Sequence, residues 1–153
     1  MKQQGTLRAM QVVHRAMLLV LIVFAAIAFF LVYANKFLPS LADMDHLFQI
    51  IAVTVSFAGF FIGSALFKKK MQQARDSSTG IKTKAEVYRS ASIIQWALLE
   101  GPCILCIICF LLVGNYAFLA LAAALMFWFA LNGPSKIKAM MLLRLGEEEM
   151  ENF

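Results

Sequence analysis

Apolar residues gather in four long blocks along the chain, and polar segments separate these blocks. The first two cover residues 16–33 and 47–67 and contain no charged side chain. The other two cover residues 91–113, which carry the single acidic residue Glu100, and residues 116–131. An apolar helix of about 18 residues or more crosses roughly 30 Å of hydrocarbon. The pattern therefore predicts four membrane-spanning helices, of which the fourth is only just long enough.

The length and uniform apolarity of these blocks also predict the fold class. Inside lipid the backbone must satisfy its own hydrogen bonds, so spanning segments are helices or strands of closed barrels, and barrel strands alternate in polarity. The chain is 61% hydrophobic, against about 45–50% in soluble domains. We expect an all-α fold, an integral membrane four-helix bundle of two transmembrane hairpins that forms one domain over residues 1–153.

The basic residues predict how the spans are oriented. Thirteen of the fourteen Lys and Arg residues fall before the first block, between the second and third, or after the fourth, and only Lys36 falls on the opposite side. Such an excess marks the cytoplasmic side. We expect both termini and the central loop in the cytoplasm, with the spans in the inner (plasma) membrane. The first block exceeds the usual 7–15 residues of a signal-peptide core, which favours an uncleaved span over a removable signal.

The net charge of +5 raises the question of a nucleic-acid partner. The positions of the charges are better explained by topology and by anionic lipid at the cytoplasmic face, and the folded module and stacking aromatic residues of nucleic-acid binders are not visible. The expected partners are the lipid bilayer and anionic lipid, with no nucleic acid.

Two segments outside the spans are expected to be ordered. Residues 68–90 read as a helical hairpin cap that extends the second and third spans, with Thr83 and Glu86 as a capping box at the start of the third helix. Residues 135–151 read as a basic amphipathic segment with an acidic tail. Its apolar side chains, expected against the membrane surface, are Ile137, Met140, Met141 and Leu145.

Glu100 is the first candidate for a functional site, because a carboxylate near the middle of a span is costly and usually faces the protein interior or a cavity. Pro102 has no N–H to give to the carbonyl of Leu98, so an unpaired acceptor lies within one turn of Glu100. With Gln95, these residues form a candidate proton or ion site. The alternative is a protonated structural carboxyl group that hydrogen-bonds across the bundle to Gln95 or to polar residues of the second span, namely Gln49, Thr54 and Ser56.

A face of small residues is expected to pack the second span. Ala52, Ser56, Gly59 and Gly63 are spaced four, three and four apart and include a Gly-x-x-x-Gly element. Small residues let transmembrane helices approach closely. We interpret this face as the intramolecular seam, with a dimer interface as the alternative.

The Cys and His residues do not predict a metal site. Cys103, Cys106 and Cys109 fan around a helix instead of converging, which favours packing over metal binding. His14 and His46 fall at opposite membrane borders and are expected to be interfacial side chains. No metal and no cofactor are expected.

Two family resemblances follow from particular residues. The stretch 97–101, Ala-Leu-Leu-Glu-Gly, with the apolar run that follows it, resembles the ion-carrying helix of the c-type proteolipid of rotary ATP synthases, over about residues 50–113. That resemblance implies that Glu100 is an ion carrier and that Arg75 matches the loop arginine. The segment from Tyr88 through Asn115 to Lys136 resembles small four-span bacterial membrane proteins of uncharacterised function, which implies no activity.

These observations leave two classes of function open. The first is an accessory or scaffold component of a membrane assembly, which implies a membrane-protein partner or a homo-oligomer. The second is a proton or cation translocator that uses Glu100. An enzyme is not expected, because no nucleophile with a base, no metal-ligand cluster and no phosphate-binding loop is visible.

Overall fold

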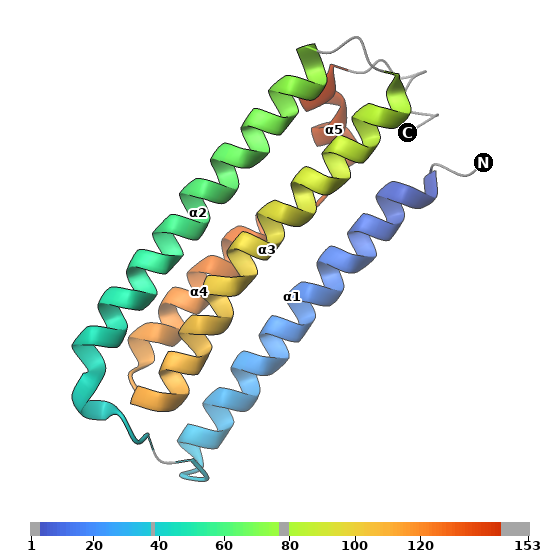
Figure 1. Cartoon of the computed structure of the whole chain (residues 1–153). Helices are drawn as coiled ribbons and strands as arrows, with labels where there is room; N and C mark the ends of the chain where they lie inside the picture. The colour runs from blue at the N-terminus through green and yellow to red at the C-terminus, as the bar shows by residue number, and fades with distance from the viewer. Residues whose placement is uncertain (1–3, 38, 77–79, 145–153) are drawn as a thin grey trace.

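The computed structural model describes residues 4–37, 39–76 and 80–144, and all secondary structure in these residues is helical. The all-α prediction is therefore confirmed for the described part of the chain. In chain order the elements are α1 (Gln4–Tyr33), the short 3-10 helix η1 (Ala42–Met44), α2 (Asp45–Asp76), α3 (Ile81–Val113), α4 (Tyr116–Leu131) and α5 (Lys136–Leu143) (Figure 1).

The central element of the fold is α3, which packs against α1, α2 and α4. The start of α1, the end of α2, the start of α3 and the helix α5 all lie at one end of the molecule, and the end of α1, the start of α2 and the turn between α3 and α4 lie at the opposite end (Figure 1). The described basic residues, with the exception of Lys36, lie in the segments that lead to the first end. We call it the basic end.

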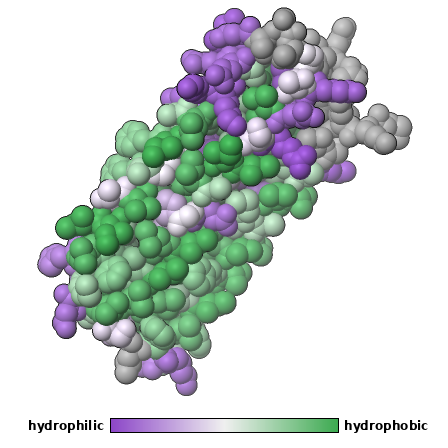
Figure 2. Space-filling view, viewed as in Figure 1, coloured by the Kyte–Doolittle hydropathy of each residue, from purple (hydrophilic) through white to green (hydrophobic). Residues whose placement is uncertain are grey.

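An apolar surface covers the middle of the molecule between two polar ends (Figure 2). Three helical segments, Leu7–Tyr33, Ala42–Asp76 and Lys82–Val113, are long and apolar enough to cross a membrane. A fourth crossing requires α4 and α5 together, and these two helices are bent by 74°. Half of the apolar window of α3 is buried inside the protein, but only 11% of that of α1 is. Such a large outward apolar surface is typical of a protein that lies in lipid.

The long hairpin between α2 and α3 projects beyond the apolar surface at the basic end, because α2 continues to Asp76 and α3 begins at Ile81. The predicted capping box is wrong. The N-cap of α3 is Gly80, whose backbone is extended, and it makes no side-chain cap bond. The N–H of Thr83 donates to the Gly80 carbonyl at 3.0 Å. Thr83 is therefore inside the first turn of the helix instead of capping it.

Residues Lys136–Leu143 of the C-terminal amphipathic segment form the helix α5, which buries one side against the protein, a contact that was not predicted. Ala139 and Leu143 are buried, and α5 packs against α2. Ile137 and Met141, one turn apart, are 63% and 75% exposed. Leu145 and the acidic tail lie outside the described residues. The helix therefore turns one side to the protein and leaves a small apolar pair outward.

Candidate functional site

The seam between α2 and α3 is formed by the small residues of α2. Ala52, Ser56, Gly59 and Gly63 are all buried. A Cβ atom at Gly59 would lie 2.8 Å from Cγ of Pro102 and even closer to the carbonyl oxygen of Leu98. One at Gly63 would lie 3.4 Å from Cβ of Leu98. The two helices therefore approach so closely at Gly59 that a larger side chain meets backbone.

Pro102 lies inside α3, which continues as one helix from Ile81 to Val113. Because proline has no N–H, the carbonyl of Leu98 lacks its usual helical donor. That carbonyl faces the α-carbon of Gly59 on the neighbouring helix, a geometry in which Cα–H groups make weak hydrogen bonds. The acceptor freed by Pro102 is therefore covered by α2.

Glu100 lies on a different side of α3 from the other candidate ion-site residues. Gln95 is only 6% exposed, and its backbone carbonyl and the side chain of Leu98 adjoin Gly63 of α2. Glu100 is two residues from Leu98 and from Pro102, which is about 200° around a helix. The structure thus gathers Gln95, Leu98 and Pro102 on the α2 side and does not bring Glu100 to them. Glu100 itself is half-buried.

Small, exposed residues adjoin Glu100 on the outward side of α3. Ala97 and Gly101 are both exposed, and a Cβ at Gly101 would meet nothing within 4 Å. Ile93 and Ile108 continue this side with 42% and 40% exposure. We call these four residues with Glu100 the outward face of α3.

The polar residues of α2 that were candidate partners of Glu100 have other neighbours. The amide nitrogen of Gln49 donates to the Asp45 carboxylate at 2.9 Å. The hydroxyl of Ser56 lies 3.7 Å from the thiol sulfur of Cys106. Thr54 is exposed. Gln49 therefore lies at the end opposite the basic end, Ser56 lies in the seam between α2 and α3, and Thr54 lies at the surface.

A buried polar cluster at the basic end of α4 was not predicted from the sequence. His14 of α1, expected to be interfacial, is only 4% exposed. Its Nε2 lies 3.0 Å from the carbonyl oxygen of Phe129, and because a carbonyl only accepts, this nitrogen carries the proton. The imidazole stacks on the Phe129 ring with centroids 4.5 Å apart. Trp96 of α3 donates from Nε1 to the carbonyl of Asn132 at 3.2 Å.

Two further side chains complete this cluster around the break between α4 and α5. Gln11 donates to the carbonyl of Pro134 at 3.2 Å, and Lys138 donates to the side-chain oxygen of Asn132 at 3.3 Å. The last carbonyls of a helix have no partner within it. Here His14 of α1 bonds to a carbonyl of the last turn, and Trp96 of α3 and Gln11 of α1 donate to carbonyls just beyond it. The cluster therefore joins the bend after α4 to α1, α3 and α5.

The burial of His14 could have been predicted from helical spacing, although a polar residue is not usually expected in a buried position. Over residues 7–33 of α1 the buried residues are Met10, His14, Leu21 and Ala28, and their spacings of four, seven and seven follow one helix face. A polar residue on an otherwise buried line must have a partner, and the end of α4 provides it.

The three cysteines are buried, and two of them contact different helices. Cys106 meets Ser56 of α2, whereas the thiol of Cys103 donates to the carbonyl of Ala122 on α4 at 3.7 Å. Among the residues that the structure describes, no group of three His, Cys, Asp or Glu side chains is arranged to hold a metal ion. The observed contacts of Cys103 and Cys106 therefore join α3 to α4 and to α2.

No protein-family model, curated protein or solved structure matches the chain. The resemblances of residues 50–113 to the c-type proteolipid and of residues 88–136 to small four-span bacterial proteins stay predictions.

Proposed function

We propose that this chain is an integral protein of the inner (plasma) membrane with four spanning helices and with both termini in the cytoplasm. We further propose that it is a non-enzymatic accessory or scaffold component of a membrane assembly. Three long apolar helices, and α4 continued by α5, support four crossings. The basic end supports the orientation, because Lys and Arg are enriched on the cytoplasmic side.

The observation that carries the proposal is the position of Glu100 on the outward face of α3. A carboxylate at mid-span costs at least about 2.5 kcal/mol in lipid. The exposed Ala97 and Gly101 beside it leave room for a second helix to approach closely. A transmembrane helix of a partner that brings a hydrogen-bond donor to mid-depth would cover the small residues and satisfy the carboxyl group.

Gly101 offers the test, because a side chain there enters open space in the isolated protein. We expect Gly101→Leu to fold normally but to obstruct the partner helix. Ala124→Leu, at an exposed position of α4, is the matched control. Native membranes are solubilised in mild detergent, and the mass of the purified particle is measured by size exclusion with light scattering.

The proposal predicts a particle larger than one chain for the wild type and for Ala124→Leu, and a single chain for Gly101→Leu. A particle of two identical chains would make a second copy the partner. Single chains in all three samples, or complexes unaffected by Gly101→Leu, would remove the proposal.

A second candidate function, proton or cation translocation, is favoured by the partial exposure of Glu100 midway along a span. Glu100→Gln separates the two, because glutamine keeps hydrogen-bonding capacity but does not titrate. An accessory protein should keep its complex in this variant. A translocator should show flux in liposomes as wild type and lose it as Glu100→Gln.

A further inference from the structure

A pocket of about 200 Å³ lies between α2 and α5 at the basic end. Its lining combines an apolar part with a basic and polar part: Phe67, Met71 and Leu142 with Lys68, Gln72 and Arg75. Phe67 and Met71 are buried, whereas Lys68, Gln72 and Arg75 are exposed. The pocket therefore has an apolar base and a basic rim.

The basic rim is suited to a phosphate group. Arg75 contacts the Asp76 carboxylate through Nε at 3.5 Å, and a guanidinium group has four other N–H donors. Lys68 is two helical turns away on the same helix and directly follows the last apolar residue of the span. Basic pockets between helices at the cytoplasmic boundary are typical binding places for anionic lipid head groups.

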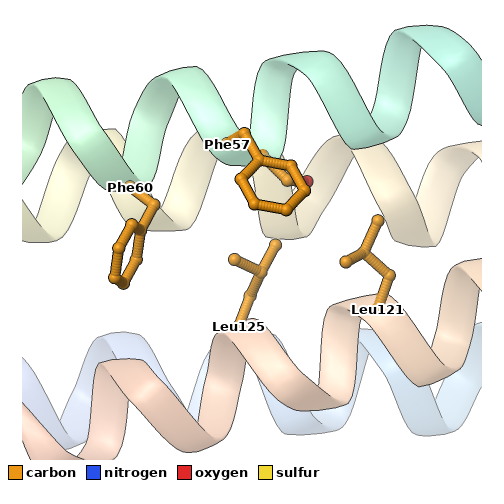
Figure 3. A pocket seen from close by; sticks show the side chains of 5 residues that line it. Phe57, Phe60, Leu121 and Leu125 are labelled. Atoms are coloured by element: carbon orange, nitrogen blue, oxygen red, sulfur yellow. The ribbon is translucent and has the colours of Figure 1, made fainter.

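A second pocket, of about 180 Å³, lies between α2 and α4 in the apolar part of the molecule. It is lined by Ser56, Phe57, Phe60, Leu121 and Leu125. Figure 3 shows Phe57 and Phe60 on α2 facing Leu121 and Leu125 on α4 across the space between the helices. The only polar side chain of this lining is that of Ser56, and its hydroxyl lies against the Cys106 thiol. The lining is therefore suited to an apolar ligand.

The two pockets lie on the same side of α2. Phe60 lines the apolar pocket, and Phe67 and Met71 line the basic one. Their spacings of seven and four follow one helix face. Phe57 and Lys68 are eleven residues apart, or about 17 Å along the helix, which is close to the roughly 15 Å thickness of one lipid leaflet's hydrocarbon.

Phe60, which lines the apolar pocket, meets Trp128 of α4 with ring centroids 5.1 Å apart. Trp128 is 40% exposed, so part of this ring pair is accessible to an acyl chain at the surface. An extended acyl chain that starts at the basic rim would pass over this ring pair and end between α2 and α4.

We propose that an anionic phospholipid binds along this side of α2, with its phosphate between Lys68 and Arg75 and one acyl chain in the pocket formed by Phe57, Phe60, Leu121 and Leu125. The lipid acts as a bound ligand that ties α2 to α4 and α5, the two neighbours that close the pockets. This site is separate from the outward face of α3 and does not depend on a partner there.

The test measures lipid retention by native mass spectrometry of the full chain released from mild detergent. The probes are phosphatidylglycerol, phosphatidylcholine with the same acyl chains, and water-soluble glycerol phosphate. Lys68→Gln combined with Arg75→Gln removes the rim. Lys69→Gln combined with Arg89→Gln is the matched control, because it makes the same change of charge at exposed positions outside the pocket.

The proposal predicts that phosphatidylglycerol is retained in preference to phosphatidylcholine and that the rim variant binds it about tenfold more weakly than the control. Leu121→Phe, which fills the apolar pocket, should also weaken retention, whereas Leu131→Phe at an exposed position should not. Equal retention of both lipids, or equal loss in both charge variants, would overturn the proposal. Binding of glycerol phosphate as tight as that of the lipid would overturn it in favour of a free-phosphate site.

Discussion

Gly59 on α2 lies directly against the carbonyl oxygen of Leu98 on α3, the acceptor that Pro102 leaves without a helical donor. Proline in a helix interior commonly costs about 3 kcal/mol or more, partly through this lost bond. Here the neighbouring helix covers the acceptor, and only glycine lets it come so near. Gly59 and Pro102 therefore act as a pair where α2 and α3 approach each other closely.

Gly59→Ala should destabilise the protein by about 1–3 kcal/mol, because the added methyl group meets backbone that cannot move freely. Gly101→Ala is the control: its methyl group enters open space, and alanine favours a helix over glycine by roughly 0.5–1 kcal/mol. Unfolding curves in detergent titrated with SDS measure both. Equal stability of the two variants would contradict the close contact.

His14→Phe should lower the stability by about 1 kcal/mol. Phenylalanine keeps the stacking on Phe129 but cannot donate to its carbonyl, which still accepts from the N–H of Asn132 at 3.0 Å. His46→Phe changes an exposed residue at the other end and should have little effect. The same unfolding assay compares the two variants. If His14→Phe were as stable as the wild type, the cluster would not stabilise the end of α4.

Asn115 joins the connection before α4 to α2. Its side-chain oxygen accepts from the N–H of Ala117 at 2.9 Å, and its nitrogen donates to both carboxylate oxygens of Asp45, at 3.0 and 2.9 Å. Asn115→Ser keeps an N-cap acceptor but loses the hydrogen bonds to Asp45. Asn115→Asp also keeps the acceptor but places a second carboxylate beside Asp45, so it should be less stable than Asn115→Ser at neutral pH.

That difference should depend on pH in a defined direction. Two adjacent carboxylates repel each other only while both are ionised. Acid favours a proton shared between the two carboxyl groups of Asn115→Asp, which removes the repulsion and restores a donor, so the stability gap between Asn115→Asp and Asn115→Ser should narrow from pH 7 to pH 4. Denaturation at pH 7 and at pH 4 measures it, and a gap that widens in acid would refute the contact.

The orientation is tested with single cysteines at opposite ends. Gly80→Cys and Ser40→Cys alter exposed positions at the basic end and at the other end, respectively. The three native cysteines are buried and should give little background, which the parent protein controls. In intact cells an impermeant maleimide should label Ser40→Cys and leave Gly80→Cys unlabelled until the membrane is opened. The reverse pattern would invert the topology.

The helical class could be predicted from the sequence because hydropathy marks residues that prefer lipid. The first and last residues of the helices could not be predicted in this way, because the helices continue into polar segments whose hydropathy does not distinguish helix from loop. Thus α1 begins at Gln4 and not at residue 16, and α3 begins at Ile81, before the Thr83 capping box. The buried side of α5 was also missed, since Ala139 contributes little to hydropathy yet fits closely against the protein.

The candidate site could be predicted only in part. Glu100 is recognisable in the sequence because it is the single carboxyl group in an apolar block. The side of α3 on which it lies depends on how α3 packs against three other helices. Leu98 and Pro102 were close to Glu100 in sequence and lie on the α2 side. The cluster at His14 required contacts across 115 residues, which no local pattern contains.

The central claim, that the outward face of α3 receives a partner helix, is tested most directly by a photo-crosslinking amino acid at position 97. Position 124 on the exposed side of α4 is the control. The account predicts one discrete protein adduct from position 97 and none from position 124, with the adduct retained in Glu100→Gln and lost in Glu100→Leu. Adducts with lipid alone from position 97, or the same protein adduct from both positions, would contradict it.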